Sequence, residues 1–177
     1  MIIDEKILMR AKKVKALILD VDGVLTDGSI ILDGGTAELK AFNVRDGHGI
    51  KLLQRNDIKV AFITGKESEV VKRRASDLGV EFVYQKALDK LIPYNDLKEK
   101  LNLEDEYFAS VGDDLLDIPI AKRVGFSVAV ADAEEELKSR VSYITNALGG
   151  RGAVREVCDI ILKSKGLWAD VLKRYDR

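Results

Sequence analysis

Short apolar runs alternate along the chain with stretches of helical period, and this alternation is the feature that most restricts the fold. The runs are rich in β-branched residues and bounded by charges or glycine, as buried parallel strands usually are. They cover residues 14–19, 58–63, 82–84, 107–111 and 126–130. The amphipathic stretches between them cover residues 46–55, 67–78, 88–101 and 115–124. The pattern predicts an α/β fold, a Rossmann-like open parallel sheet with helices on both faces.

Two segments depart from this alternation. Residues 26–44 hold two short strand-like runs around Asp33-Gly34-Gly35, which predicts a small β-hairpin inserted directly after the first strand. The tail, residues 149–177, opens with a glycine-rich turn and predicts one or two amphipathic helices with an apolar stripe containing Trp168 and Leu172. That stripe either packs on the core or contacts another subunit. We expect residues 1–177 to form one domain, since one domain per roughly 150 residues is usual.

Composition narrows the class of protein. Hydrophobic residues make up 46% of the chain, charged residues 33%, and the net charge is -1. These values indicate a folded, soluble protein and argue against nucleic acid or an anionic membrane as a partner. The lone Cys158 lies in an apolar run, where a buried small hydrophobe is expected rather than a nucleophile. The N-terminal segment has no apolar run long enough for a signal peptide or membrane span, which favours a cytoplasmic location.

The strongest functional signal is the string KALILDVDGVLTDG, in which an apolar strand ends at Asp20. Asp22 follows two residues later, and Gly23 allows the chain to turn sharply. In open α/β sheets, ligands bind beyond the carboxyl ends of the strands, which is where both carboxylates are expected. The structural alternative is a helix cap and a turn former.

Two further elements are weaker taken singly. A second apolar strand, VAFITGK, ends in Thr64 and Gly65, where a hydroxyl and free backbone N–H groups can bind phosphate oxygens. Thr-Gly after a strand is also a common turn. Lys90 lies near the start of a predicted helix, where an isolated lysine is usually a solvated surface charge. Its interpretation therefore depends on the other elements.

The fourth element is a cluster of acids in the string SVGDDLLD. A strand ending at Val111 brings Asp113, Asp114 and Asp117 to the sheet edge where Asp20 and Asp22 are expected. Five carboxylates in so small a region would repel each other strongly unless a cation were bound. Hard oxygen ligands with no accompanying Cys/His cluster favour Mg²⁺ over zinc. A site that only stores metal would not explain Thr64 or Lys90.

Taken in order, DVDGV, the threonine of ITG, a helix lysine and GDDLLD resemble the four motifs of the haloacid dehalogenase phosphatase superfamily. The resemblance implies that Asp20 attacks phosphorus and forms an aspartyl-phosphate. It implies that Asp22 protonates the leaving alkoxide and then deprotonates the hydrolytic water. Asp20, Asp113 and the backbone carbonyl of Asp22 would hold magnesium. Thr64 and Lys90 would neutralise the phosphoryl oxygens.

The spacing between these motifs leaves no room for the cap domain that most superfamily members carry. A capless chain with a hairpin in this position resembles the 3-deoxy-D-manno-octulosonate 8-phosphate phosphatase family. The strings that carry this likeness are LILDVDGVLTDG, ELKAFNVRDGHGI, SVGDDLLD, SVAVADA and GGRGAVREVCD. The resemblance implies a homotetramer in which the hairpins form a central barrel and neighbouring subunits replace the cap. It also implies a step in lipopolysaccharide biosynthesis.

Basic residues should reach the carboxylate of such a sugar acid. By the resemblance, Lys66 and Arg74 match positions that contact substrate across the subunit boundary. Arg45 and Arg151 are further candidates, with a surface cation as the equal alternative for each. The family often has arginine at position 66, whereas phosphatases of nonulosonate 9-phosphates can carry lysine, so that substrate class is an alternative. His48 is expected to be packing or polar surface rather than a phosphate acceptor.

A third possibility is a non-catalytic regulatory domain that keeps the same fold. A domain without catalysis has no chemical need for the set Asp20, Asp22, Lys90 and Asp113, and all four are present. Their presence favours an enzyme.

Overall fold

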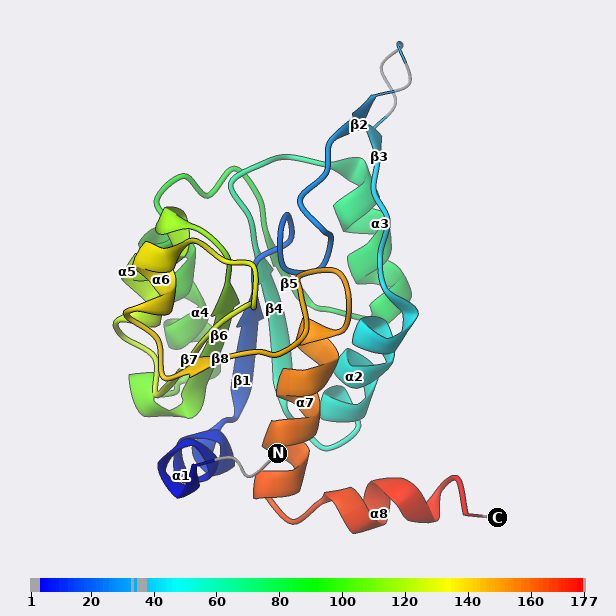
Figure 1. The fold of residues 1–177 in the computed structure, drawn as a ribbon, viewed down its shortest axis with the longest axis vertical. Helices are drawn as coiled ribbons and strands as arrows, with labels where there is room; N and C mark the ends of the chain where they lie inside the picture. The colour runs from blue at the N-terminus through cyan, green and yellow to red at the C-terminus, as the bar shows by residue number, and fades with distance from the viewer. Residues whose placement is uncertain (1–3, 33, 35–37, 177) are drawn as a thin grey trace.

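The computed structural model describes residues 4–32, 34 and 38–176, and its centre is a six-stranded parallel sheet (Figure 1). The strand order is β5-β4-β1-β6-β7-β8. The strands are β1 (Ala16–Leu19), β4 (Lys59–Ile63), β5 (Phe82–Tyr84), β6 (Phe108–Gly112), β7 (Phe126–Ala129) and β8 (Tyr143–Ile144). The predicted α/β class and open parallel sheet are confirmed, and β8 is an additional edge strand that the apolar pattern did not reveal.

Eight α-helices lie in the described part of the chain. They are α1 (Glu5–Lys13), α2 (Val44–Gln54), α3 (Glu69–Leu78), α4 (Leu91–Leu101), α5 (Ile118–Ala121), α6 (Glu135–Lys138), α7 (Ala153–Ser164) and α8 (Trp168–Lys173). Two 3₁₀ turns, η1 (Asp105–Tyr107) and η2 (Leu115–Asp117), precede and follow β6. None of these helices has the length and apolar character that a membrane span requires.

The single helix predicted for residues 115–124 is wrong in detail. The carboxylate of Asp114 accepts a hydrogen bond from the Leu115 N–H and, with Asp117, forms a capping box on the short turn η2. Pro119 then lies in the first turn of α5, where the missing N–H costs nothing. The segment is therefore a 3₁₀ turn followed by one short helix. This break leaves Asp117 at the junction, facing the carboxyl end of β6.

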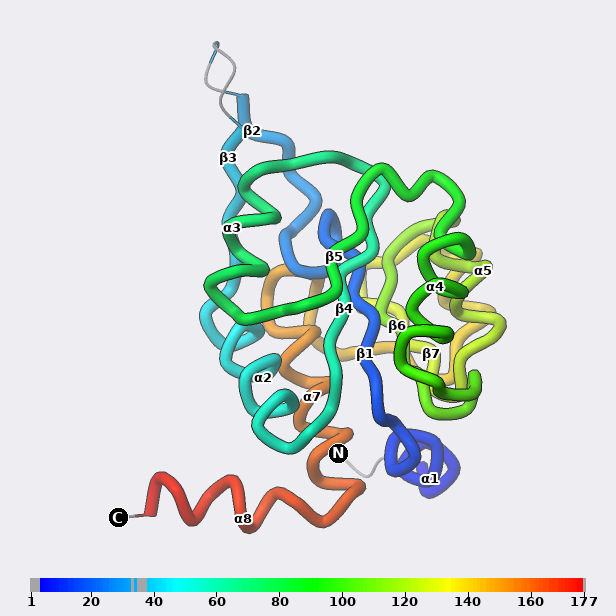
Figure 2. Tube along the Cα trace, turned by 180° about the vertical axis from the view of Figure 1, so that it is seen from behind, coloured from blue at the N-terminus to red at the C-terminus, as the bar shows by residue number. Residues whose placement is uncertain are grey.

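Alternate residues of β1 enter two separate hydrophobic cores. Leu17 and Leu19 belong to a core that includes residues of α1, α2, α3 and α7, whereas Ala16 and Ile18 belong to one that includes residues of α4 and α5. The ribbon in Figure 1 and the tube in Figure 2 both show α2, α3 and α7 on one side of the sheet and α4 and α5 on the other. Because both faces of the sheet are covered, all four residues of the central strand β1 are apolar and buried. Cys158 is fully buried as expected, and burial raises the pKa of its thiol.

The predicted hairpin is confirmed directly after the first strand. Strands β2 (Ile31–Leu32) and β3 (Glu38–Leu39) pair antiparallel and project away from the sheet and helices (Figure 1). Of the predicted turn Asp33-Gly34-Gly35, only Gly34 is described, with a φ of +81°, and its two neighbours lie outside the described residues. Large apolar side chains of the hairpin are exposed, namely Ile30 (67%), Ile31 (46%), Leu32 (74%) and Leu39 (52%).

The glycine-rich turn of the tail packs against the loop that follows β1. The N–H of Gly150 donates to the carbonyl of Val24 at 2.8 Å. A Cβ at position 149 would lie 1.7 Å from the carbonyl oxygen of Gly23, so only glycine allows this approach. The tail therefore supports the loop that carries Asp22. Further along, the tail forms α7 and α8, and Trp168 packs against the core while Leu172 remains 42% exposed.

Candidate active site

Three neighbouring strand ends meet at one edge of the sheet. Because β1 lies between β4 and β6, Asp20 and Asp22 are flanked by Thr64 on one side and Asp113 on the other. A pocket of about 360 Å³ opens there, lined by Asp20, Asp22, Gly28, Thr64, Gly65, Lys66, Leu88, Lys90, Asp113, Asp114, Leu116 and Asp117. The structure thus brings together all five predicted acids, the Thr-Gly pair and two lysines.

Gly23 is the residue that permits this crowding. Its φ is +87°, and a Cβ there would lie 2.0 Å from Oδ2 of Asp113. Any side chain would therefore push the Asp113 carboxylate away from Asp20. The glycine of DVDG serves both the turn and the close approach of the two motifs.

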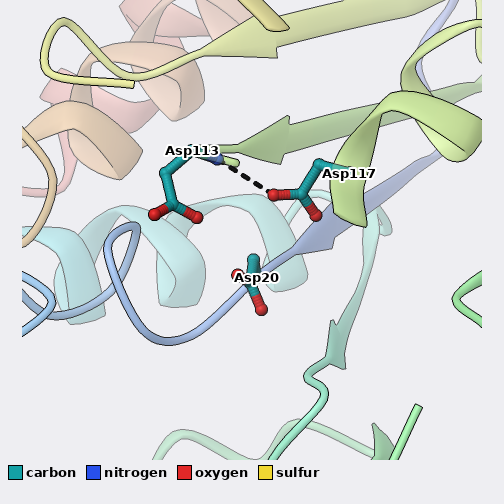
Figure 3. A group of neighbouring side chains, drawn as sticks. All are labelled: Asp20, Asp113 and Asp117. Carbon is teal, nitrogen blue, oxygen red and sulfur yellow. Dashed lines mark hydrogen bonds between the residues drawn. The ribbon is translucent and has the colours of Figure 1, made fainter. Parts of the chain in front are cut away.

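Lys90 is the positive centre of the cluster. Its Nζ lies 3.0 Å from Oδ1 of Asp20 and 2.6 Å from Oδ1 of Asp117, and its side chain is only 2% exposed. The other oxygen of Asp117 accepts a hydrogen bond from the backbone N–H of Asp113 at 3.0 Å (Figure 3). Asp117 therefore orients both Lys90 and the start of the Asp113 loop. The sequence pattern predicts Asp117 in the acid cluster but indicates no role for it.

Burial and mutual repulsion perturb these groups strongly. Burial, together with the negative charge of Asp117, raises the pKa of Asp20 to about 6, although Lys90 opposes the shift. Burial and the charges of Asp20 and Asp117 raise the pKa of Asp113 to about 8. Burial lowers the pKa of Lys90, but attraction to Asp20 and Asp117 outweighs it, so the net shift is upward. The cluster holds excess negative charge that a cation would relieve.

The donors present fit a hard divalent cation such as Mg²⁺. Asp20, Asp113 and Asp117 each offer a carboxylate oxygen, and these oxygens lie within 4.8 Å of one another. Both oxygens of Asp117 are already bonded, to Lys90 and to backbone N–H groups. Among the described residues, no N–H donates to the backbone carbonyl oxygen of Asp22. Asp20, Asp113 and that carbonyl are therefore the donors available to the metal, and oxygen-only sets suit magnesium.

These pKa shifts predict that magnesium binding releases protons. A carboxyl whose pKa is raised by folding destabilises the fold when it ionises, so the metal-free protein should lose stability as the pH rises from about 4 to about 8. Magnesium at a fixed concentration should then raise the melting temperature more at pH 8 than at pH 6. The gain grows by up to about 1.4 kcal/mol per pH unit for each proton displaced.

Calorimetric melting of the protein in chelator and in magnesium, at both pH values, measures this difference. Asp113→Asn removes the carboxyl with the larger shift and should flatten the pH dependence of the magnesium effect. An equal stabilisation by magnesium at pH 6 and pH 8 in the unmodified protein would contradict the prediction.

Thr64 occupies the opposite wall of the pocket. It follows β4, is 3% exposed, and its Oγ1 accepts a hydrogen bond from the backbone N–H of Lys66 at 3.4 Å. Its backbone N–H donates to the carbonyl of Tyr84 on β5, which holds the strand end in place. The hydroxyl hydrogen therefore remains available for a phosphate oxygen.

A second charged group, which the sequence pattern does not predict, lies beside Asp22. Lys40 follows β3 and forms an ion pair with Oδ1 of Asp22, and its Nζ lies 3.2 Å from Oε1 of Glu38. The same Glu38 oxygen lies 2.7 Å from Nζ of Lys66. The pKa of Glu38 is lowered to about 2, and the largest cause is the hydrogen bond that Lys66 donates to it. No periodic signal marks these residues, because the hairpin returns to the site only in the folded chain.

The three arginines predicted to contact substrate do not line this pocket. Arg45 is exposed at the start of α2, and Arg74 stacks over Phe42 with Nη2 3.4 Å from the carbonyl of Asn43. Arg151 is 67% exposed and pairs with Asp27 at 3.2 Å. None of the three is among the described residues that line the pocket. Their predicted contacts with substrate are therefore not made by the pocket of a single chain as the structure describes it.

His48 is half-buried, and its Nε2 lies 3.1 Å from the hydroxyl of Tyr175. It is not among the described residues that line the pocket, consistent with a packing or polar role.

The sheet order, the capless site and the acid cluster with a buried lysine define a haloacid dehalogenase-like hydrolase, and a match to that family covers residues 76–154. The chain is 51% identical to the 3-deoxy-D-manno-octulosonate 8-phosphate phosphatase KdsC of Escherichia coli K12, over 90% of this chain and 85% of that protein. It belongs to this phosphatase family.

Solved structures agree with this assignment. The crystal structure of the phosphatase of that name from Yersinia pestis superposes with a TM-score of 0.93 at 46% identity, covering 94% of this chain and 90% of the other. The Moraxella catarrhalis phosphatase, solved in complex with a magnesium ion, a phosphate ion and KDO, has a TM-score of 0.94 at 39% identity, covering 97% and 98%.

Proposed function

We propose that this protein is a magnesium-dependent phosphatase that hydrolyses 3-deoxy-D-manno-octulosonate 8-phosphate to the free sugar acid and phosphate, in lipopolysaccharide biosynthesis. The observation that carries the proposal is the pairing of Asp20 with buried Lys90, at 3.0 Å, inside a carboxylate cluster suited to magnesium. The identity with KdsC over nearly the whole chain supports the substrate.

The geometry supports a two-step reaction. An oxygen of Asp20 attacks phosphorus, the bond from phosphorus to the sugar oxygen breaks, and Asp22 gives its proton to the leaving alkoxide. Water then attacks the phosphorus of the aspartyl-phosphate and loses a proton to Asp22. The bond from phosphorus to the Asp20 oxygen breaks, so phosphate is released and the Asp20 carboxylate is restored. Magnesium supplies the positive charge that allows an anionic ester to approach a carboxylate. Lys90 and the Thr64 hydroxyl neutralise the phosphoryl oxygens as charge shifts onto them.

Assembly follows from the same proposal. The exposed apolar side chains of the hairpin, Ile30, Ile31, Leu32 and Leu39, favour contact with other copies of the chain. We propose a homotetramer in which Arg45, Lys66, Arg74 and Arg151 reach a substrate carboxylate, some of them across a subunit boundary. Residues 1–177 acting as one domain, and a cytoplasmic location, remain predictions of the sequence.

One observation favours a second substrate class. Lys66 lines the pocket with a side chain that is 47% exposed, and lysine at this position is compatible with a nonulosonate 9-phosphate. Both substrates carry a carboxylate that a cation in the pocket could bind, so it is the lysine in place of arginine, and not the charge, that favours this second class.

Phosphate release from a panel of esters tests the proposal. We expect kcat/KM for the octulosonate 8-phosphate to exceed that for a nonulosonate 9-phosphate and for glucose 6-phosphate by at least about tenfold, a difference of about 1.4 kcal/mol in transition-state binding. Equal rates on glucose 6-phosphate would contradict both sugar-acid assignments. No release from any ester in magnesium would favour the non-catalytic domain.

A further inference from the structure

Lys40 is a buried amine that the reaction described above does not use. Its side chain is 2% exposed, although it comes from the segment that follows the exposed strand β3. Its ammonium bridges Oδ1 of Asp22 and Oε1 of Glu38. Lys40 is not among the described residues that line the pocket, so it acts on substrate only through another side chain.

We infer that Lys40 is a positioning residue for Asp22, which holds one carboxylate oxygen so that the other faces the leaving group of the phosphate ester. The inference rests on the proposed function, because it assigns Asp22 the transfer of a proton to the sugar oxygen. It adds a residue to that site and a structural role for the base of the hairpin.

The arrangement of charges supports this role. Asp22, Lys40, Glu38 and Lys66 form a row in which negative and positive groups alternate. A buried ammonium is retained in a fold only when its partners compensate for lost hydration, and both of its carboxylates do so. Lys66 binds the same oxygen of Glu38 and so holds Glu38 in place. Glu38 in turn keeps the Lys40 ammonium next to Asp22.

The bonding of Asp22 itself is asymmetric. Oδ1 is bound by Lys40, whereas no described residue hydrogen-bonds to Oδ2. The Asp22 side chain is 33% exposed and lines the pocket, whereas the Lys40 side chain is 2% exposed and is not among the described residues that line it. One oxygen is thus anchored by the Lys40 ammonium, and the other is left to face the leaving group. A carboxylate held at one oxygen has fewer rotamers to lose in the transition state.

The leaving group provides a readout that separates positioning from general damage. An alkoxide such as the sugar oxygen is a poor leaving group and needs a proton from Asp22. The p-nitrophenolate leaves as a stabilised anion and needs none. The ratio kcat/KM reports only the steps up to departure of the leaving group, so the later water step does not enter the comparison.

The experiment measures kcat/KM for the octulosonate 8-phosphate and for p-nitrophenyl phosphate in magnesium. For Lys40→Met we expect a loss of about tenfold to a hundredfold on the sugar phosphate and less than about threefold on the aryl ester, in keeping with the usual worth of general acid catalysis. Asp22→Asn should show the same selectivity with a larger loss. Lys59→Met, which removes a half-exposed lysine 3.9 Å from Glu81 at the opposite end of β4, should change neither value.

An equal loss on both esters in Lys40→Met would overturn the inference and indicate a purely structural role. If that variant does not fold, Lys40→Arg retains the charge but changes the bonding geometry, and it should show a smaller loss that is still selective for the sugar phosphate. A loss in Lys40→Arg that is equal on both esters would also overturn it. Absence of hydrolysis of both esters by the unmodified protein would instead refute the proposed function.

Discussion

Asp20→Asn should lower kcat for phosphate release by at least about a thousandfold, because an amide oxygen is a far poorer nucleophile than a carboxylate. The variant should also form no phosphorylated enzyme when the reaction with substrate is quenched rapidly in acid. It should remain folded, since burial and neighbouring charge raise the pKa of Asp20 to about 6 and its ionised form is a cost to the metal-free fold. Thermal melting in chelator should therefore give a melting temperature no lower than that of the unmodified protein.

Asp57→Asn is the matched control for this change. Asp57 is exposed in the turn before β4, far from the pocket, and its φ of +60° is one that asparagine adopts readily. Its turnover should equal that of the unmodified protein. Magnesium-dependent turnover retained in Asp20→Asn would remove this residue from the nucleophile role.

Lys90→Met should have the second largest effect, and it should act on both activity and stability. The ammonium bridges Asp20 and Asp117 at 3.0 and 2.6 Å, so its loss leaves two buried carboxylates without their compensating charge. Removing one partner of a buried pair typically costs about 3–5 kcal/mol. We expect kcat to fall by about a hundredfold or more, since a positioned cation at a transferring phosphoryl group is worth several kcal/mol.

Denaturant unfolding in chelator and in magnesium measures the stability effect of Lys90→Met. Magnesium should recover part of the loss, because the ion neutralises the same carboxylates. Lys72→Met provides the control. Lys72 is half-exposed, and its ion-pair partners among the described residues are two exposed glutamates of α3 and the preceding loop, an interaction worth about 0–1 kcal/mol. Turnover within about threefold of the unmodified protein would show that Lys90 is not part of the phosphate site.

The central site could be predicted because it follows from strand order and hydrophobic pattern. Each of Asp20, Thr64 and Asp113 comes directly after an apolar run, and parallel strands bring such positions to one edge of the sheet. Lys90 was harder to interpret, because a lysine at a helix start is usually solvated. Only the fold shows that it is 2% exposed and directed at Asp20.

The segment after β6 shows where periodicity misleads. Residues 115–124 have helical spacing, yet the capping box of Asp114 and Asp117 and the following proline divide them into η2 and α5. Local hydrogen bonds from short acidic side chains compete with helix formation, and here they prevail. This competition places the Asp117 carboxylate between Lys90 and the backbone of Asp113, a role that spacing did not reveal.

By itself, the sequence determined the α/β class, the hairpin and the edge of the sheet where the acids meet, because apolar period and strand ends are properties of neighbouring residues. Only the tertiary structure decided which charges compensate one another. Lys40 is 18 residues from Asp22, and Lys90 is 27 residues from Asp117. The pairing of buried charges depends on which side chains are desolvated together. The spacing of residues along the sequence does not indicate which distant side chains these are.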